Sequence, residues 1–200
     1  MNYEINLDIL DNYKTHQRVL DIKNAALIII EMQNVFKGSI ISDRQLLNVK
    51  KLIQFSKSNN IPNIYVQHND SSENSDNMIQ WWNGDKIAKG SQEWQIIDDF
   101  NTDNDILIDK SQYSAFYGTN LEEILKEHNI SDLIICGVMT NCCCETTTRD
   151  AFMRGYNVFF INDATGTINA DLHISALKNI SFGFANVSNT DSFINQDNKG

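Results

Sequence analysis

Three consecutive cysteines occupy positions 142–144, between an apolar run that ends at Gly137 and a segment of helical periodicity. An apolar run, a glycine, a Thr/Asn capping signal and a periodic segment are typical of a strand, a tight turn and a helix. If the helix begins at residues 140–141, Cys143 lies in its first turn, where unpaired N–H groups and the helix dipole favour an anion. We therefore predict a lowered pKa and a nucleophilic thiolate at Cys143; the alternative is that these cysteines are small core residues.

Two further ionisable residues follow apolar runs of strand length. Glu31 follows residues 25–30, and Lys110 follows residues 105–108. A carboxylate can take the thiol proton and deliver one to a leaving group, an ammonium favours thiolate, and helix N–H groups can hold an oxyanion. The set predicts covalent acyl transfer without a catalytic histidine. The alternatives are a solvated strand end for Glu31 and a lysine that extends to solvent for Lys110.

Two other strand ends carry polar residues with weaker signals. His68 follows residues 63–67, and a lone histidine in such a place is more often a structural residue than a catalyst. Asp163 follows residues 157–161, and we interpret it as a helix cap or turn residue.

Short apolar runs alternate with segments of helical periodicity along the whole chain. The apolar runs are nearly continuous, as expected for strands buried on both faces of a parallel sheet. This alternation predicts an α/β fold: a single-domain, doubly wound, mainly parallel sheet of about six strands with helices on both faces. Ligands of such sheets bind beyond the carboxyl ends of the strands. The predicted strands are 25–30, 63–67, 105–108, 132–137, 157–161 and 183–187, and the predicted helices are 44–59, 120–128, 141–154 and 171–180.

Composition limits the partners and the compartment. The 200 residues have a formal net charge of -10, which argues against a nucleic-acid or anionic membrane surface. No apolar stretch approaches the roughly 18–20 residues that span a bilayer, and no signal peptide is visible. Three adjacent thiols suit neither a disulfide framework nor paired zinc spacing, so we expect reduced cysteines and a cytoplasmic protein.

The four blocks around these strand ends resemble the isochorismatase-like cysteine hydrolases, which include nicotinamidases, N-carbamoylsarcosine amidohydrolases and ureidoacrylate-type hydrolases. The order and spacing of the blocks match over about residues 23–190, and the blocks are residues 25–36, 109–121, 137–151 and 155–164. The resemblance implies an isochorismatase-like, Rossmann-like domain at 23–190, with an N-terminal extension at 1–22 packed on it and a C-terminal tail at 191–200 that frays from residue 195.

The resemblance also implies roles for particular residues. It assigns the nucleophile to Cys143 and the family lysine to Lys110, and it implies a cis peptide bond before Met139. The N–H groups of Met139 and Cys143 would form the oxyanion hole. Glu31 stands where the family has aspartate, and its side chain is about 1.5 Å longer by one C–C bond. We expect Glu31 to be the base, because the chemistry requires only a carboxylate.

Substrate contacts follow from the resemblance as well. His68 aligns with a polar contact position, Trp82 with a pocket aromatic, and Phe36 is expected to face the pocket; core packing is the alternative for each. Val66 occupies the position of the ligand aspartate of nicotinamidases, so we predict no metal and no cofactor. Specificity is expected in residues 68–95.

The leading hypothesis is a metal-independent cysteine hydrolase that cleaves a C–N bond of a small amide, ureide or carbamoyl compound. One alternative is vinyl-ether hydrolysis of an isochorismate-like substrate, and the cysteine argues against it. The other is a catalytically inactive binding relative, which the substitution at Glu31 suggests. The resemblance further implies a homo-oligomer, either a dimer or a tetramer.

Overall fold

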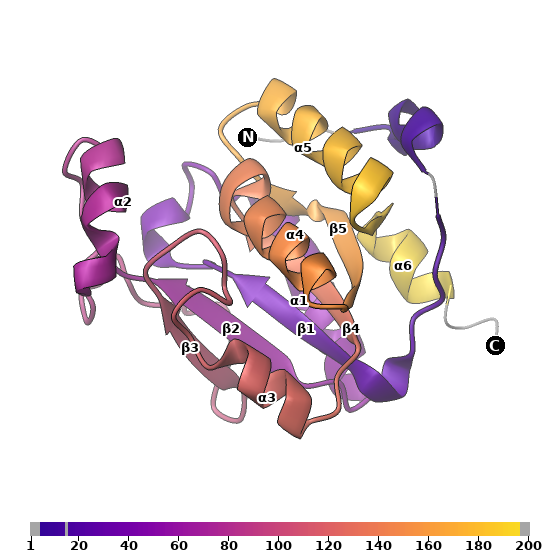
Figure 1. Cartoon of the computed structure of the whole chain (residues 1–200), viewed down its shortest axis with the longest axis horizontal. Helices are drawn as coiled ribbons and strands as arrows, with labels where there is room; N and C mark the ends of the chain where they lie inside the picture. The colour runs from indigo at the N-terminus through magenta and orange to yellow at the C-terminus, as the bar shows by residue number, and fades with distance from the viewer. Residues whose placement is uncertain (1–4, 15, 197–200) are drawn as a thin grey trace.

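The computed structural model describes residues 5–14 and 16–196 and has a six-stranded sheet with helices on both faces (Figure 1). The strands lie in the order β3-β2-β1-β4-β5-β6, and each neighbouring pair is parallel. The chain fills one half of the sheet outward from β1 and then the other half outward from β4. The crevice for a ligand is therefore expected beyond the carboxyl ends of β1 and β4. The predicted fold class is confirmed.

The strands are β1 (Ala25–Ile30), β2 (Asn63–His68), β3 (Ile106–Lys110), β4 (Asp132–Val138), β5 (Asn157–Gly166) and β6 (Asn186–Ser188). The α-helices are α1 (Asp43–Ser58), α2 (Asp76–Trp81), α3 (Leu121–Glu127), α4 (Glu145–Met153), α5 (Ala170–Gly183) and α6 (Thr190–Gln196). Short 3-10 turns and one π turn, η5 (Thr140–Cys144), connect them.

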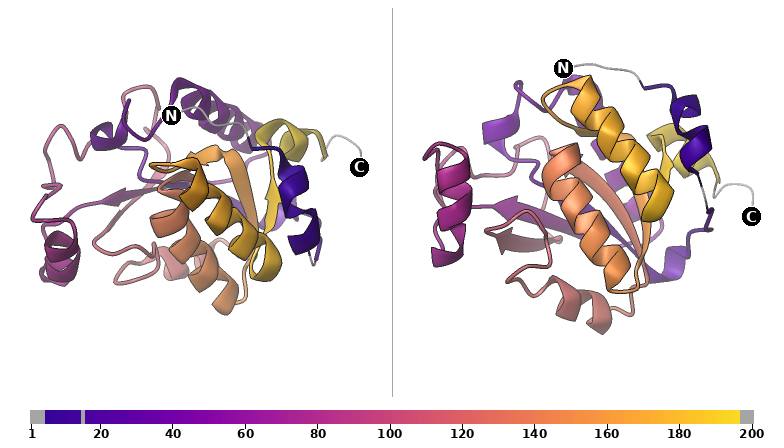
Figure 2. Two further views of the ribbon diagram at one scale, coloured as in Figure 1. Left: turned by 90° about the horizontal axis from the view of Figure 1, so that it is seen from above. Right: turned by 45° about the horizontal axis from the view of Figure 1, so that its top comes forward.

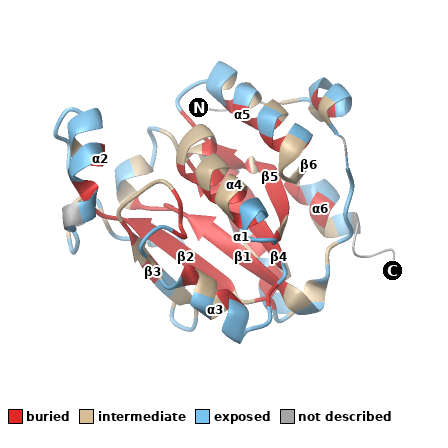
Figure 3. Ribbon diagram, viewed as in Figure 1, coloured by how far each residue is buried: buried red, intermediate tan, exposed pale blue. Residues whose placement is uncertain are grey.

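Alternate residues of the buried strands supply two separate cores. Ile28 and Ile30 of β1 face α3, α4 and α5, whereas Leu27 and Ile29 face α1 and α6. Figure 2 shows α1 on one side of the sheet and α4 with α5 on the other. Strands β1, β2 and β4 are buried along their whole length, which explains why the sequences of β1 and β4 are continuously apolar rather than alternating (Figure 3).

The observed elements differ from the predicted ones near the site and at the C-terminal edge of the sheet, where residue 183 belongs to α5 and β6 covers residues 186–188 rather than 183–187. Strand β5 runs on to Gly166, because the polar residues after Ile161 still pair with the end of β4. The helix predicted from residue 141 is divided into the π turn and α4. Helix α2 was not predicted, since its six residues are too few to show an apolar period, and it projects from the body of the molecule (Figure 1).

The chain ends pack partly against the domain. Leu10 of the N-terminal segment is fully buried in the core that faces α5. Helix α6 begins at Thr190 and contains residues 191–196 of the expected tail, and Phe193 packs into the core that faces α1. Residues 1–4, 15 and 197–200 lie outside the described part of the chain. Among the described residues, no helix has the length and apolar character to cross a bilayer.

Candidate active site

Lys110, the last residue of β3, is the centre of a buried cluster of polar groups. Its side chain has no exposed surface, and its ammonium forms an ion pair with the carboxylate of Glu31. The ammonium also donates to the carbonyl of Gln112 at 2.7 Å and to Sγ of Cys143 at 3.4 Å. An ammonium has three N–H donors, so these three acceptors satisfy it completely. The structure thus brings together the three residues that the sequence singled out for chemistry.

The charges of this cluster are strongly coupled. Burial alone would lower the pKa of Lys110, but Cys143 and Glu31 outweigh burial and raise that pKa to about 12. The lysine is therefore cationic across the physiological range. Burial, the charge of Glu31 and a hydrogen bond to Glu31 raise the pKa of the Cys143 thiol well above its usual value, and Lys110 only partly opposes them.

The prediction of a lowered pKa at Cys143 is therefore wrong for this arrangement. The sequence placed Cys143 at a helix N-terminus, but it did not show that the thiol would be buried beside a carboxylate. The neutral thiol can pass its proton to Glu31 when it attacks a substrate, because its hydrogen bond to Glu31 already joins donor and acceptor.

The turn that carries Cys143 depends on a glycine at the end of β4. Gly137 pairs with Ile30 of β1 and has φ of 119°, a conformation that L side chains rarely adopt. A Cβ at Gly137 would lie 1.9 Å from the carbonyl oxygen of Ile30, so only glycine fits. The Val138–Met139 peptide bond is cis, and the Met139 carbonyl accepts the N–H groups of Cys142 and Cys144. Met139 and Cys143, the predicted oxyanion-hole residues, therefore lie in one short turn.

The π turn separates the three neighbouring thiols. Cys143 alone of the three has a hydrogen bond to Lys110 among the described residues. Cys144 is fully buried, and burial raises the pKa of its thiol. Cys142 is partly exposed, and burial, Glu31 and Glu145 raise the pKa of its thiol to about 11.

Glu31 lies just beyond β1 in a left-handed backbone conformation, with φ of 51°. Non-glycine residues with positive φ are uncommon and cluster at functional sites. Its N–H still pairs with the Val66 carbonyl of β2 at 2.8 Å, so the bend occurs at the last paired residue. The longer side chain reaches Lys110 from this bent strand end, and it is 4% exposed.

His68 ends β2 in register with Lys110. Its Nε2 lies 2.9 Å from Oδ1 of Asp70, and both side chains are buried. Oδ2 of Asp70 accepts the N–H of Ile87, and the Asp70 N–H donates to the Ile87 carbonyl. His68 thereby connects the sheet to residues 69–96, the segment that returns from β2; the sequence analysis missed Asp70, two residues further on.

The two predicted aromatic contacts occupy different surroundings. Phe36 is partly buried and packs against the core that faces α1, which is not the core that contains Cys143. Trp82 follows α2 and is 41% exposed. Its indole hydrogen-bonds the hydroxyl of Tyr113, whose pKa is raised mainly by burial and also by Cys142, Cys143 and Glu31. Tyr113 was not singled out from the sequence, although it lies three residues after Lys110.

A buried chain of polar side chains supports the turn from the other side. His173 of α5 contacts Oγ1 of Thr140 through Nδ1 at 2.8 Å and Oδ1 of Asn162 through Nε2 at 2.7 Å. The amide N–H of Asn162 donates to Asn189, so its oxygen accepts from Nε2–H of His173. Nδ1 then accepts the hydroxyl proton of Thr140, and burial lowers the pKa of His173 to about 4. Asp163, the predicted cap or turn residue, accepts the N–H and hydroxyl of Thr190 at the start of α6.

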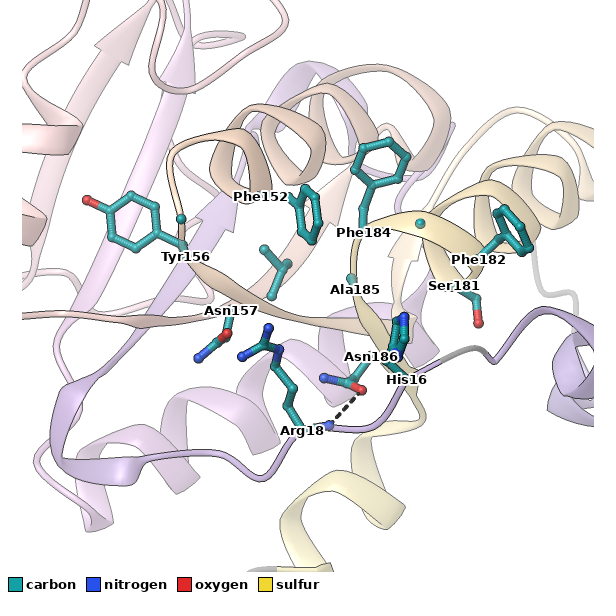
Figure 4. Close-up of a pocket in the computed structure, with 13 residues that line it drawn as sticks. His16, Arg18, Phe152, Tyr156, Asn157, Ser181, Phe182, Phe184, Ala185 and Asn186 are labelled. Carbon is teal, nitrogen blue, oxygen red and sulfur yellow. Dashed lines mark hydrogen bonds between the residues drawn. The ribbon is translucent and has the colours of Figure 1, made fainter.

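A separate hollow of about 700 Å³ lies where α4 and α5 end and β5 and β6 begin (Figure 4). Phe152, Tyr156, Phe184 and Arg18 line it, and none of Glu31, Lys110 and Cys143 does. No group of three His, Cys, Asp or Glu side chains lies together as a metal site in the described ranges.

The fold and the site together define a hydrolase with a doubly wound α/β sheet. More particularly, the chain belongs to the isochorismatase family, since the family model for the isochorismatase domain matches residues 25–192. A solved structure described as a cysteine hydrolase from Pseudomonas syringae pv. phaseolicola 1448A has the same fold. It superposes with a TM-score of 0.84 at 24% identity and covers 90% of this chain and 95% of its own.

Two relatives of known name are similar in sequence to this chain, and they differ in how much of their own length it matches. The chain is 41% identical over 177 residues to Nicotinamidase 3 of Arabidopsis thaliana, covering 86% of this chain and 88% of that protein. It is 30% identical over 164 residues to Enterobactin synthase component B of Escherichia coli (strain K12), covering 78% of this chain. The chain spans only 57% of the length of the second relative.

We predict that brief treatment with substoichiometric iodoacetamide labels Cys143 first, although Cys142 is the more exposed thiol. The reason is that the Lys110 ammonium lies 3.4 Å from Sγ of Cys143 and stabilises the thiolate that reacts, whereas no such hydrogen bond reaches Cys142 among the described residues. Peptide mass spectrometry locates the adduct. Cys142→Ser should keep the labelling rate, whereas Lys110→Met should slow it; an adduct chiefly on Cys142 would show that exposure alone decides.

The buried His173 should make the protein sensitive to acid. Its pKa of about 4 in the folded state lies below the unfolded value of about 6.5, so the unfolded chain binds the proton first. Stability from this residue is complete above about pH 6.5 and falls toward pH 4, by on the order of 3 kcal/mol. Urea unfolding at several pH values should show this loss in the parent and not in His173→Gln. Parallel profiles for the two proteins would contradict it.

Proposed function

We propose that this protein is a metal-independent cysteine hydrolase that cleaves the C–N bond of a small amide, ureide or carbamoyl compound. The observation that carries the proposal is the buried contact of one ammonium, Lys110, with both a carboxylate and a thiol. A buried charge is costly unless it is paired, so a lysine kept in this place requires both partners. The name of the 41% identical relative, Nicotinamidase 3, supports an amide as the substrate.

The proposed reaction begins with attack of Sγ of Cys143 on the amide carbonyl carbon while Glu31 takes the thiol proton. The N–H groups of Met139 and Cys143 hold the oxyanion, and Lys110 stabilises the sulfur as its charge develops. Glu31 then gives the proton to the leaving nitrogen as the C–N bond breaks, which leaves a thioester on Cys143. Glu31 next takes a proton from water, which attacks the thioester carbon; the C–S bond breaks, the acid leaves, and Glu31 returns the proton to the sulfur of Cys143.

Two features argue for this reaction over the alternatives. A thiol hydrogen-bonded to both a cation and a carboxylate is suited to covalent attack, whereas vinyl-ether hydrolysis requires only a proton donor. The glutamate also reaches Lys110 from its bent strand end, so the substitution of the family aspartate does not leave the lysine unpaired.

The direct test is a panel of small amides and ureides, with nicotinamide among them, assayed for release of ammonia and acid. The protein should hydrolyse at least one compound, and Cys143→Ser should abolish that activity while Cys144→Ser mainly lowers stability. Chelators should leave the rate unchanged. Release of no acid from any compound, together with tight binding of one of them, would instead establish a binding protein.

Variants of Glu31 test the base. Glu31→Gln keeps the shape but cannot accept the proton, so kcat should fall by at least about 10²-fold. Glu31→Asp withdraws the carboxylate by about 1.5 Å, and we expect a loss of about 10- to 100-fold because Lys110 and Cys143 are no longer reached together. Steady-state kinetics at constant pH gives both numbers. Faster turnover of Glu31→Asp would show that the glutamate slows the enzyme rather than serves as an adapted base.

A further inference from the structure

Gln33 is a buried amide beside the candidate site that has no part in the proposed chemistry. Its side chain is 0% exposed and makes three hydrogen bonds to backbone groups. Oε1 accepts the N–H of His68 at 2.8 Å, and Nε2 donates to the His68 carbonyl at 3.0 Å. Nε2 also donates to the carbonyl of Trp94 at 2.7 Å. Because both N–H donors and the oxygen are used, the orientation of this amide is fixed.

These bonds extend the pairing of β1 with β2 beyond the end of β1. The backbone of β1 makes its last contact with β2 through the N–H of Glu31, which donates to Val66. Two residues later the side chain of Gln33 pairs with the N–H and carbonyl of His68, as a backbone peptide group would. Glu31 is therefore held between two fixed contacts on the same neighbouring strand.

The third bond ties this strand end to the returning segment. Residues 32–35 pair with residues 93–97 through the N–H groups of Asn34, Val35 and Ile97, and Gln33 forms an antiparallel bridge with Ile96. The other end of the segment is fastened to His68 through Asp70. Both ends of residues 69–96 thus connect to the backbone that Gln33 holds.

We propose that Gln33 is a positioning residue that fixes the left-handed turn at Glu31 and so sets the distance of its carboxylate from the Cys143 thiol. It touches neither the thiol nor the ammonium and acts through the backbone of Glu31 and His68. The inference rests on the proposed function for its kinetic consequence only. The position of the Glu31 carboxylate beside Cys143 also affects the rate at which the thiol is alkylated, and this rate can be measured without a substrate.

The matched control is Gln67, the neighbouring buried amide on β2. Its Nε2 donates to the same Trp94 carbonyl at 3.1 Å, and among the described residues its side chain makes no hydrogen bond to Glu31, Gln33 or His68. Gln67 is 5% exposed, so replacing either glutamine by methionine removes a buried amide of the same size. If Gln33 had only a structural role, the two variants would show the same changes in stability, in kcat and in the labelling rate of Cys143.

The experiment compares Gln33→Met with Gln67→Met in urea unfolding, in kcat and KM, and in the rate at which iodoacetamide labels Cys143. Gln33→Met should lower kcat by about 10- to 100-fold with little change in KM, because the base is misplaced rather than the substrate contacts. It should also label Cys143 faster, since a retracted carboxylate no longer raises the pKa of the thiol while Lys110 still favours thiolate. Gln67→Met should lower stability and leave both rates near those of the parent.

Equal kinetic effects in the two variants would overturn the proposal, as would faster labelling of Cys136 and Cys144 together with Cys143, which would indicate general loosening. If Gln33→Met does not fold, Gln33→Asn replaces it, because asparagine keeps a neutral amide but is shorter by one C–C bond, about 1.5 Å, and so withdraws that amide from the His68 backbone. If the panel of amides gives no hydrolysis, the labelling rates of Cys143 in the two variants still decide the proposal.

Discussion

The burial of one ammonium group is the constraint from which the site follows. Lys110 lies in the dry interior at the end of β3, and an unpaired charge there would destabilise the fold by several kcal/mol. Its three donors therefore require three acceptors, which come from the strand ends of β1 and β3 and from the turn after β4. Because Nζ of Lys110 must be paired, a carboxylate, a carbonyl and a thiol lie around it. The proposed acyl transfer requires a carboxylate and a thiol in the same contact with a cation.

Much of this arrangement could be predicted from the sequence, because strands that are buried on both faces of a parallel sheet are continuously apolar. Continuous apolar runs predicted β1 and β4 closely, and the rule for strand ends brought Glu31, Lys110 and Cys143 to one edge of the sheet. The backbone conformation of Glu31 was not predictable, since glutamate carries no signal for a positive φ. The pKa of Cys143 was predicted in the wrong direction because it depends on burial and on the distance to a second charge, which spacing along a chain does not give.

The contacts that the sequence analysis missed share a physical cause. Gln33 to His68, Asp70 to Ile87 and His173 to Thr140 all join a side chain to a group that only the folded backbone brings near. Polar residues in turns have no periodicity that would predict a partner. These contacts nevertheless hold the strand end and the turn that carry Glu31 and Cys143. The precise positions of the two side chains therefore depend on residues whose partners the sequence does not predict.

The segment of residues 69–96 contains every tryptophan of the protein, since the three are Trp81, Trp82 and Trp94. Trp81 is 74% exposed and Trp82 is 41% exposed, while the indole nitrogen of Trp94 is buried. The sheet and the helices that cover it are free of indole. Tryptophan fluorescence therefore reports on one part of this protein. The emission depends on the solvation of residues 69–96 beside the site and not on the packing of the core.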